Sequence, residues 1–160
     1  MENAVKALIM AAGVLIGLMI ISLGVILFSS LSQYTDSTQK RIEENAVQKF
    51  NEQFLKFINC KDESSSETEF TLTIQDIVTA ANIAYENNLS YGVTVADDNN
   101  YYVTIKMPGD NNLEKNISTN ITDLLKNNSN NKYKCTPQSV KIRQNTGRVC
   151  EVNFTEIVPE

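Results

Sequence analysis

The longest apolar run of the chain lies close to its N-terminus and predicts one hydrophobic helix. It extends from Ala7 to Leu31 without a charged residue or a proline. At about 1.5 Å of rise per residue, a helix of this length reaches roughly 37 Å, which exceeds a bilayer core of about 30 Å. A soluble domain of this size has no use for such a helix, so we expect it to cross a membrane or to be covered by other chains.

Three interpretations of this helix compete. A cleaved secretory signal would need a basic start, a shorter apolar run and a small-residue cleavage site, which Met1–Lys6 and the length of the run do not match. The second interpretation is a single-pass anchor. The third is a helix that packs against copies of itself. Gly13, Gly17 and Gly24 favour the third, because small residues let backbones approach closely where lipid gives no hydrophobic drive, although glycine is also common in lone membrane helices.

A second helical pattern follows the apolar run. Apolar residues recur at three- and four-residue spacing with charged residues between them, which predicts one face against a core. No proline or glycine occurs between Phe28 and Cys60, so we expect one helix of about 50 residues, half hydrophobic and half amphipathic. Two helices joined by a serine-rich hinge at residues 32–38 are the alternative. The predicted core-facing stripe is Ile42, Ala46, Val47, Phe50, Phe54, Phe57 and Ile58.

The rest of the chain alternates short helical and strand patterns. After an acidic, serine-rich loop at residues 61–69, Thr73 and Asp76 form a capping pattern for a helix that Asn87-Asn88 is expected to end. A further short helix is expected at Ile117–Lys126. Strands are expected at Phe70–Leu72, Tyr91–Val95, Tyr101–Met107, Val140–Arg143 and Arg148–Ile157, the second and third forming a hairpin.

These elements predict the fold class α+β. A long N-terminal hydrophobic helix continues as an amphipathic helix that packs on a small antiparallel sheet, with two short helices. We expect residues 1–34 to form the hydrophobic helix and residues 35–160 to form a globular head that includes the amphipathic continuation. The head is long enough for one modest hydrophobic core.

Composition narrows the functional classes. The net charge of −5 argues against a nucleic-acid partner, because no basic patch offsets phosphate repulsion. The absence of histidine from the sequence removes the commonest general base and the usual zinc ligand. Asp97, Asp98, Asn99 and Asn100 could supply calcium oxygens, but their spacing differs from an EF-hand loop and favours a plain turn. We therefore expect a protein that is not an enzyme and has no cofactor or metal.

Cysteines and sequons supply the remaining candidate sites. Cys135 and Cys150 are 15 positions apart and could close a disulfide loop, which implies an oxidising exterior, while the state of Cys60 is left open. Lysines and arginines flanking the apolar run would by counting keep the head inside, yet long domains translocate largely regardless of such charges. We therefore expect the head outside. Five asparagines lie in N-x-S/T sequons and are possible glycosylation sites: Asn88, Asn116, Asn120, Asn127 and Asn153.

The opening MENAVKALIMAAGVLIGLMIISLGV, continuing as an amphipathic helix under a small sheet with a possible C-terminal disulfide loop, resembles type IV pilins. It looks most like the pilin-like subunits of the Tad and related type II secretion-like systems. In that family the apolar helices are inserted in the cytoplasmic membrane before assembly and then pack together as the filament core. The resemblance implies a homo-oligomeric helical filament on the cell surface, together with an assembly ATPase and a platform protein as partners.

Two departures from the family concern the N-terminus. Pilins are made with a basic leader that a dedicated peptidase removes, so we expect either that Met1 opens the mature chain or that processing differs or is absent. The family places a glutamate at the fifth mature position, where this chain has Val5, and its early acid is Glu2. Glu2 would then neutralise an amine or Lys6 of an adjacent subunit, because an unpaired charge in an apolar core is costly. Alternatively, Glu2, Asn3 and Lys6 lie among lipid headgroups.

The sequence thus supports two functional hypotheses. The first is a structural subunit of an extracellular pilus-like filament, with Glu2, Lys6, Gly13, Gly17 and Gly24 as the candidate helix-packing residues. The second is a monomeric single-pass anchor for an extracytoplasmic domain that acts as a sensor or as an accessory protein of secretion. The two differ in whether the apolar helix touches its own copies.

Overall fold

The computed structural model describes residues 2–61 and 68–157, apart from the side chains of residues 118 and 120. The chain divides into two compact units, Met1–Asn45 and Ala46–Glu160. This boundary reflects which residues contact one another in the folded chain. The boundary expected after residue 34 instead marked the end of the apolar sequence. From here on, the head means the second of these units, residues 46–160, in place of the range 35–160 expected from the sequence.

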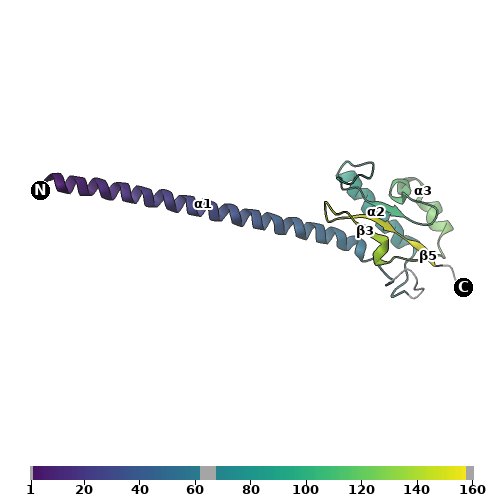
Figure 1. Ribbon diagram of the computed structural model, residues 1–160. Helices are drawn as coiled ribbons and strands as arrows, with labels where there is room; N and C mark the ends of the chain where they lie inside the picture. The colour runs from purple at the N-terminus through teal and green to yellow at the C-terminus, as the bar shows by residue number, and fades with distance from the viewer. Residues whose placement is uncertain (1, 62–67, 158–160) are drawn as a thin grey trace. The chain divides into compact units, whose positions relative to one another are not determined.

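Helix α1, Glu2–Leu55, is a single helix of 54 residues (Figure 1). The prediction of one helix, without a serine-rich hinge, is therefore confirmed. Within this stretch two hydroxyls bond back to the helix: Thr35 Oγ1 donates to the carbonyl oxygen of Leu31 and Ser37 Oγ to that of Tyr34, each at 2.9 Å. Serine and threonine are weak helix formers but do not break a helix. The polar step at residues 32–38 thus makes the surface more hydrophilic without breaking the backbone.

The amphipathic part of α1 begins to pack later than its sequence predicts. Ile42 is 57% exposed, so its expected place in the core is wrong. Phe54 is fully buried, and Phe50 packs partly buried against the same core. Asn51 fixes this end of the helix to the head: its Nδ2 donates to Gly147 O and its Oδ1 accepts from the Val149 amide, both at 2.8 Å.

Helix α2, Ile74–Ser90, starts with the predicted capping box, which is confirmed by the Thr73 amide donating to Asp76 Oδ2 at 2.9 Å. Its apolar stripe is buried, although Tyr85 at its end remains 39% exposed. The expectation that Asn87 and Asn88 end the helix is wrong. Both are buried inside α2, where their side chains bind the main chain of residues 101–103.

The sheet is mixed, which corrects the predicted antiparallel arrangement. Strand β1, Thr104–Lys106, pairs in parallel with β4, Val149–Asn153, and β3, Val140–Ile142, pairs antiparallel on the other side of β4. A separate antiparallel pair joins β2, Lys132–Lys134, to β5, Thr155–Ile157. The expected strand at residues 148–157 is thus interrupted at Phe154, whose amide bonds the carbonyl oxygen of Lys106 at 2.8 Å.

The structure differs from three further local predictions. The expected hairpin partner Tyr91–Val95 is irregular chain, since β1 takes its pairing from β4. Residues 70–72 contribute a single bridge, Leu72 to Tyr133, in place of a strand. The predicted helix at residues 117–126 is confirmed but longer, as α3, Leu113–Asn127, and a 3-10 turn, Pro137–Ser139, precedes β3.

The core of the head lies where α2, α3, the sheet and the end of α1 meet. Its largest fully buried side chains include Tyr133, Phe54, Phe154, Leu72 and Ile77. Phe57, just beyond α1, meets Phe154 edge to face with ring centroids 6.1 Å apart. Helices α2 and α3 lie against each other (Figure 1).

One carboxylate ties the three-stranded sheet together. Glu151 in the central strand β4 receives Lys106 Nζ from β1 and Lys141 Nζ from β3, each at 2.8 Å. Partial burial raises the pKa of Glu151, but the hydrogen bonds and charges of the two lysines outweigh it, so the pKa is lowered from its usual 4.5.

Candidate functional site

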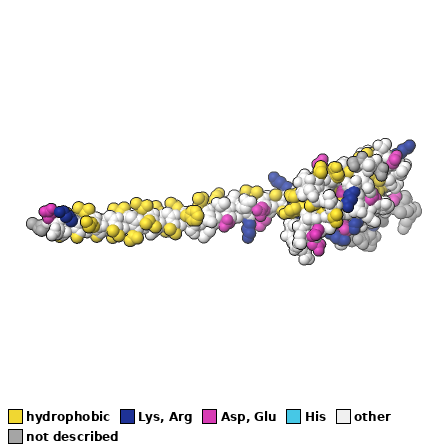
Figure 2. Space-filling view, turned by 90° about the horizontal axis from the view of Figure 1, so that it is seen from above, with side chains coloured by type: hydrophobic (Ala, Val, Ile, Leu, Met, Phe, Trp, Pro, Cys, Tyr) yellow, Lys and Arg dark blue, Asp and Glu magenta, His cyan; other side chains and the backbone are white. Residues whose placement is uncertain are grey.

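The most unusual surface of the molecule is the N-terminal half of α1. Every large apolar side chain from Val5 to Leu31 is between 58% and 76% exposed. Figure 2 shows these side chains along the helix. The most apolar 18-residue window of α1 has a mean hydropathy of 2.7, and none of this window is buried. Within the described part of the chain, α1 is the one helix long and apolar enough to cross a membrane. Such a surface requires lipid or other chains to cover it.

The three glycines of this helix share one face. Gly13, Gly17 and Gly24 are spaced by four and seven residues, so at 100° per residue they fall within about 40° of one another. This is the spacing of a seam between packed helices. A Cβ added at any of the three meets nothing within 4 Å among the described atoms. The chain's own packing therefore does not require glycine at these positions.

Glu2 and Lys6 continue the same face toward the N-terminus, eleven and seven residues before Gly13. Lys6 Nζ lies 2.9 Å from Glu2 Oε1 within the chain. The pair is exposed, so by itself it contributes little to stability. When the helix enters an apolar bundle, however, Glu2 and Lys6 enter as one neutralised ion pair and not as two isolated charges, which lowers the cost of burying them. We name Glu2, Lys6, Gly13, Gly17 and Gly24 the seam.

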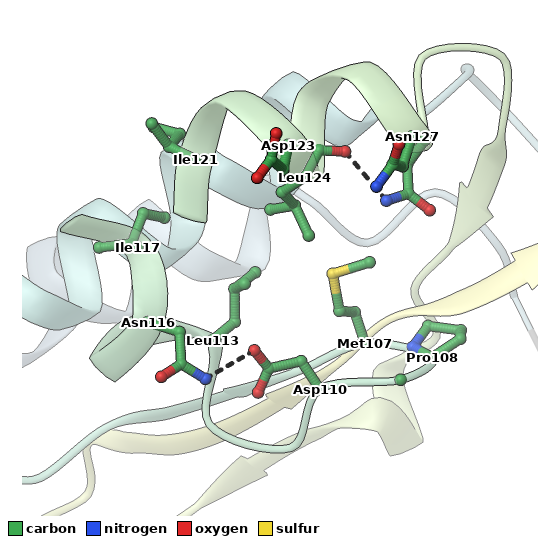
Figure 3. Close-up of a pocket in the computed structure, with 12 residues that line it drawn as sticks. Met107, Pro108, Asp110, Leu113, Asn116, Ile117, Ile121, Asp123, Leu124 and Asn127 are labelled. Carbon is green, nitrogen blue, oxygen red and sulfur yellow. Dashed lines mark hydrogen bonds between the residues drawn. The ribbon is translucent and has the colours of Figure 1, made fainter. Parts of the chain in front are cut away.

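A groove in the head runs beside α3 (Figure 3). It has a volume of about 460 Å³ and combines an apolar floor, including Met107 and Leu113, with asparagine and aspartate side chains. Asp110 holds the start of α3 in place, because its Oδ1 accepts from the Asn112 amide at 2.9 Å and its Oδ2 from Asn116 Nδ2 at 2.8 Å. The carboxylate is therefore engaged in the fold. Among the described residues, no group of three or more potential metal ligands is present.

The calcium alternative at residues 97–100 finds no support in the geometry. Asp97 Oδ1 accepts from the Asn99 amide at 2.9 Å, and Asn100 Nδ2 donates to Val95 O at 2.7 Å. Asn100 Oδ1 also accepts from the Tyr102 amide at 3.0 Å. These side-chain oxygens are used to form the turn that replaces the expected hairpin loop.

The structure separates the five sequons by burial. Asn88 is 6% exposed, and Asn153 is half-buried in β4. Asn116 and Asn127 are exposed on α3. Asn120 belongs to the same helix, but its side chain lies outside the part of the structure described.

The cysteines do not form the bond that the sequence allowed. Cys135 and Cys150 are both thiols in the structure, Cys135 fully buried and Cys150 half-buried in β4. Burial raises the pKa of Cys135 from 9.0 to about 12, and burial also raises that of Cys150. Cys60 is buried next to Cys135, whose carbonyl oxygen accepts from the Cys60 amide at 3.3 Å.

Sequence reasoning missed Arg148, which contacts three aromatic rings and donates hydrogen bonds to two side chains. The Arg148 guanidinium carbon lies 3.8 Å from the ring centroid of Phe50, and 5.0 and 4.9 Å from those of Tyr91 and Tyr101. Its terminal nitrogens donate to Tyr91 Oη at 2.8 Å and to Asn87 Oδ1 at 2.9 Å. An arginine in a turn carries no sequence signal for this role, because its partners are far away along the chain.

Glu114 was missed for the same reason. It is 1% exposed, and its two oxygens accept from Tyr102 Oη at 2.7 Å and from the Ile105 amide at 2.9 Å. Burial raises the pKa of Tyr102, and the hydrogen bond to Glu114 raises it further. This buried pair fastens α3 to β1, so it has a structural explanation.

No family model, no curated protein and no solved structure matches the chain.

Proposed function

We propose that the chain is a structural subunit of an extracellular pilus-like filament, held together by its N-terminal helices. The observation that carries the proposal is the exposed apolar half of α1 with the seam along one face. The resemblance of the opening residues to type IV pilins supports the same conclusion. Before assembly, the helix resides in the cytoplasmic membrane.

The seam favours a filament over a solitary anchor. An anchor needs only an apolar surface, which any aliphatic residues provide. Glycines repeated on one face create a shallow groove in which a neighbouring helix lies close, and close contact is the main source of attraction between helices that lipid already covers. Glu2 and Lys6 on that same face enter the contact as a paired unit.

Assembly from the membrane requires partners that supply work. If each copy hid about 1,500 Å² of apolar surface from water, the gross gain would be roughly 35 kcal/mol. The gain relative to the membrane-inserted state is far smaller, because lipid already covers the helix. An assembly ATPase and a platform protein, as in the pilins that the chain resembles, are the expected partners.

Isolation of surface filaments tests the proposal. Cells that naturally make the chain are sheared, the filaments are pelleted and imaged, and their subunit is identified by mass spectrometry. We expect the chain to be the major subunit and its gene deletion to abolish the filaments. Recovery of the chain only in dispersed membrane fractions, with filaments unaffected by the deletion, would favour the single-pass anchor and overturn the proposal.

A further inference from the structure

Three of the five sequons fall in one helix of 15 residues, α3. The structure describes two of these side chains, Asn116 and Asn127, and both are exposed. They are eleven residues apart, which at 100° per residue places them within about 20° of the same helix face. Two attachment points therefore share one outward stripe of the head.

The two sequons outside α3 are unsuited to modification. Asn88 uses both ends of its amide on Val103, since its Nδ2 donates to the carbonyl oxygen at 2.9 Å and its Oδ1 accepts from the amide at 2.8 Å. Asn153 lies in β4 opposite Lys106 and is half-buried. A glycan at Asn88 would displace the two hydrogen bonds that join α2 to Val103, and one at Asn153 would be attached at a half-buried position of β4.

The sequence of α3 is poorly explained by helix stability alone. Residues 116–122 read NISTNIT and include none of the strong helix formers. The inward positions Ile117 and Ile121 pack on the core, which accounts for the isoleucines. Thr119 and Thr122 are exposed, and glutamate, lysine or glutamine at these positions would favour the helix more strongly. Asn116, by contrast, is engaged by its hydrogen bond to Asp110. Ser118 and Thr122 each complete an N-x-S/T sequon, so their recognition as modification signals accounts for their presence in a helix.

We propose that Asn116 and Asn127 are N-glycosylated, so that α3 presents a carbohydrate-covered face of the head; this inference rests on the extracytoplasmic location in the proposed function. The donor is a lipid diphosphate-linked oligosaccharide. The asparagine Nδ2 forms a bond to the anomeric carbon, the bond from that carbon to the phosphate oxygen breaks, the lipid diphosphate leaves with the electron pair, and one amide proton passes to a base of the transferase.

The local geometry accommodates the product. Asn116 Nδ2 donates one of its two hydrogens to Asp110 Oδ2 at 2.8 Å, and a glycosylated amide keeps one hydrogen for that bond. Lys115, Asp123 and Lys126 surround the two sites as exposed polar side chains. Asn116 and Asn127 also line the groove beside α3 (Figure 3), so a sugar attached here lies at that groove and displaces no core residue.

Intact-mass measurement of the chain purified from the cells that naturally make it tests the inference. We expect a mass above the 17.9 kDa of the polypeptide, with glycans located on Asn116 and Asn127 by peptide fragmentation. Variants are compared in an Asn120→Gln background, so that each remaining glycan of α3 has a known position. Ser118→Ala and Ser129→Ala should each lose one glycan, whereas Ser118→Thr and Ser129→Thr, which keep the sequons, should lose none.

Ser90→Ala and Thr155→Ala remove the other two sequons and should leave the mass of the glycans unchanged. Unmodified chain, or glycans confined to Asn88 and Asn153, would overturn the inference. Filaments built from unmodified chain would overturn it while leaving the proposed function intact. Glycosylated chain in the absence of filaments would instead support it and overturn the filament proposal.

Discussion

Replacing Gly17 with leucine separates a helix that touches its copies from one that touches only lipid. In the isolated chain the added side chain enters open space, because a Cβ at Gly17 meets nothing within 4 Å among the described atoms. The fold of the monomer and its insertion into a membrane should therefore be unaffected, and leucine even increases the apolar surface. Any loss of assembly must come from contact with another chain.

The size of that loss follows from packing. Four extra carbon atoms must fit between helices at each contact, and overpacking of a well-packed interface costs about 1–3 kcal/mol. At about 1.4 kcal/mol for each factor of ten, this lowers the equilibrium constant for adding a subunit by roughly 5- to 150-fold. Gly13→Leu should act similarly, and the double variant more strongly.

Ala11→Leu provides the matched control, because Ala11 lies more than about 100° around the helix from each of the three glycines. The assay is the fraction of total chain that pellets as sheared filaments, quantified against the membrane fraction. We expect Gly17→Leu to reduce this fraction and Ala11→Leu to preserve it. Equal assembly of Gly17→Leu and the wild type, or equal loss in both variants, would refute the assignment of the seam.

Three further predictions concern the head. Arg148→Gln should lower the free energy of unfolding by about 2–4 kcal/mol, because it removes two charged hydrogen bonds and the stacking on Phe50. Urea denaturation in mild detergent measures this change, and an unchanged denaturation midpoint would contradict the stabilising role of Arg148. The pKa of Glu151 is lowered in the folded state, so its carboxylate stabilises the fold fully above pH 4.5 and progressively less as the pH falls below that value. The difference in free energy of unfolding between the wild type and Glu151→Gln should therefore shrink below pH 4.5. A difference that does not change with pH would contradict this. Alkylation of the native protein at pH 8, followed by intact mass, should modify Cys150 before Cys135, which is fully buried with a pKa of about 12, and the two rates should converge after denaturation.

Local patterns predicted the helices well because each signal lies within a few neighbouring residues. The apolar run and the absence of proline or glycine across residues 28–60 were sufficient for α1. Thr73 and Asp76 three positions apart were sufficient for the start of α2. The asparagine doublet at Asn87 and Asn88 was wrongly taken as the end of the helix. Both residues are buried in α2, and their side-chain amides donate hydrogen bonds to main-chain carbonyl oxygens of residues 101 and 103.

Pairings between distant segments were beyond the sequence. Residues 101–107 were assigned to a hairpin because a turn-rich stretch precedes them, yet β1 pairs in parallel with β4, more than 40 positions away. Nothing in either strand encodes that partner, since a parallel pair needs a long crossover connection, and here residues 107–148, which include α3, lie between the two strands. Arg148 and Glu114 were missed for the same reason: their roles depend on what the fold brings next to them.

The central claim is that the apolar half of α1 is covered by copies of itself. Electron cryo-microscopy of surface filaments from cells that make the chain tests this claim most directly. The account predicts a core of closely packed helices in which Gly13, Gly17 and Gly24 face a neighbouring helix and the Glu2–Lys6 pair is enclosed. A filament core built from another protein, with this helix found alone in lipid, would contradict it.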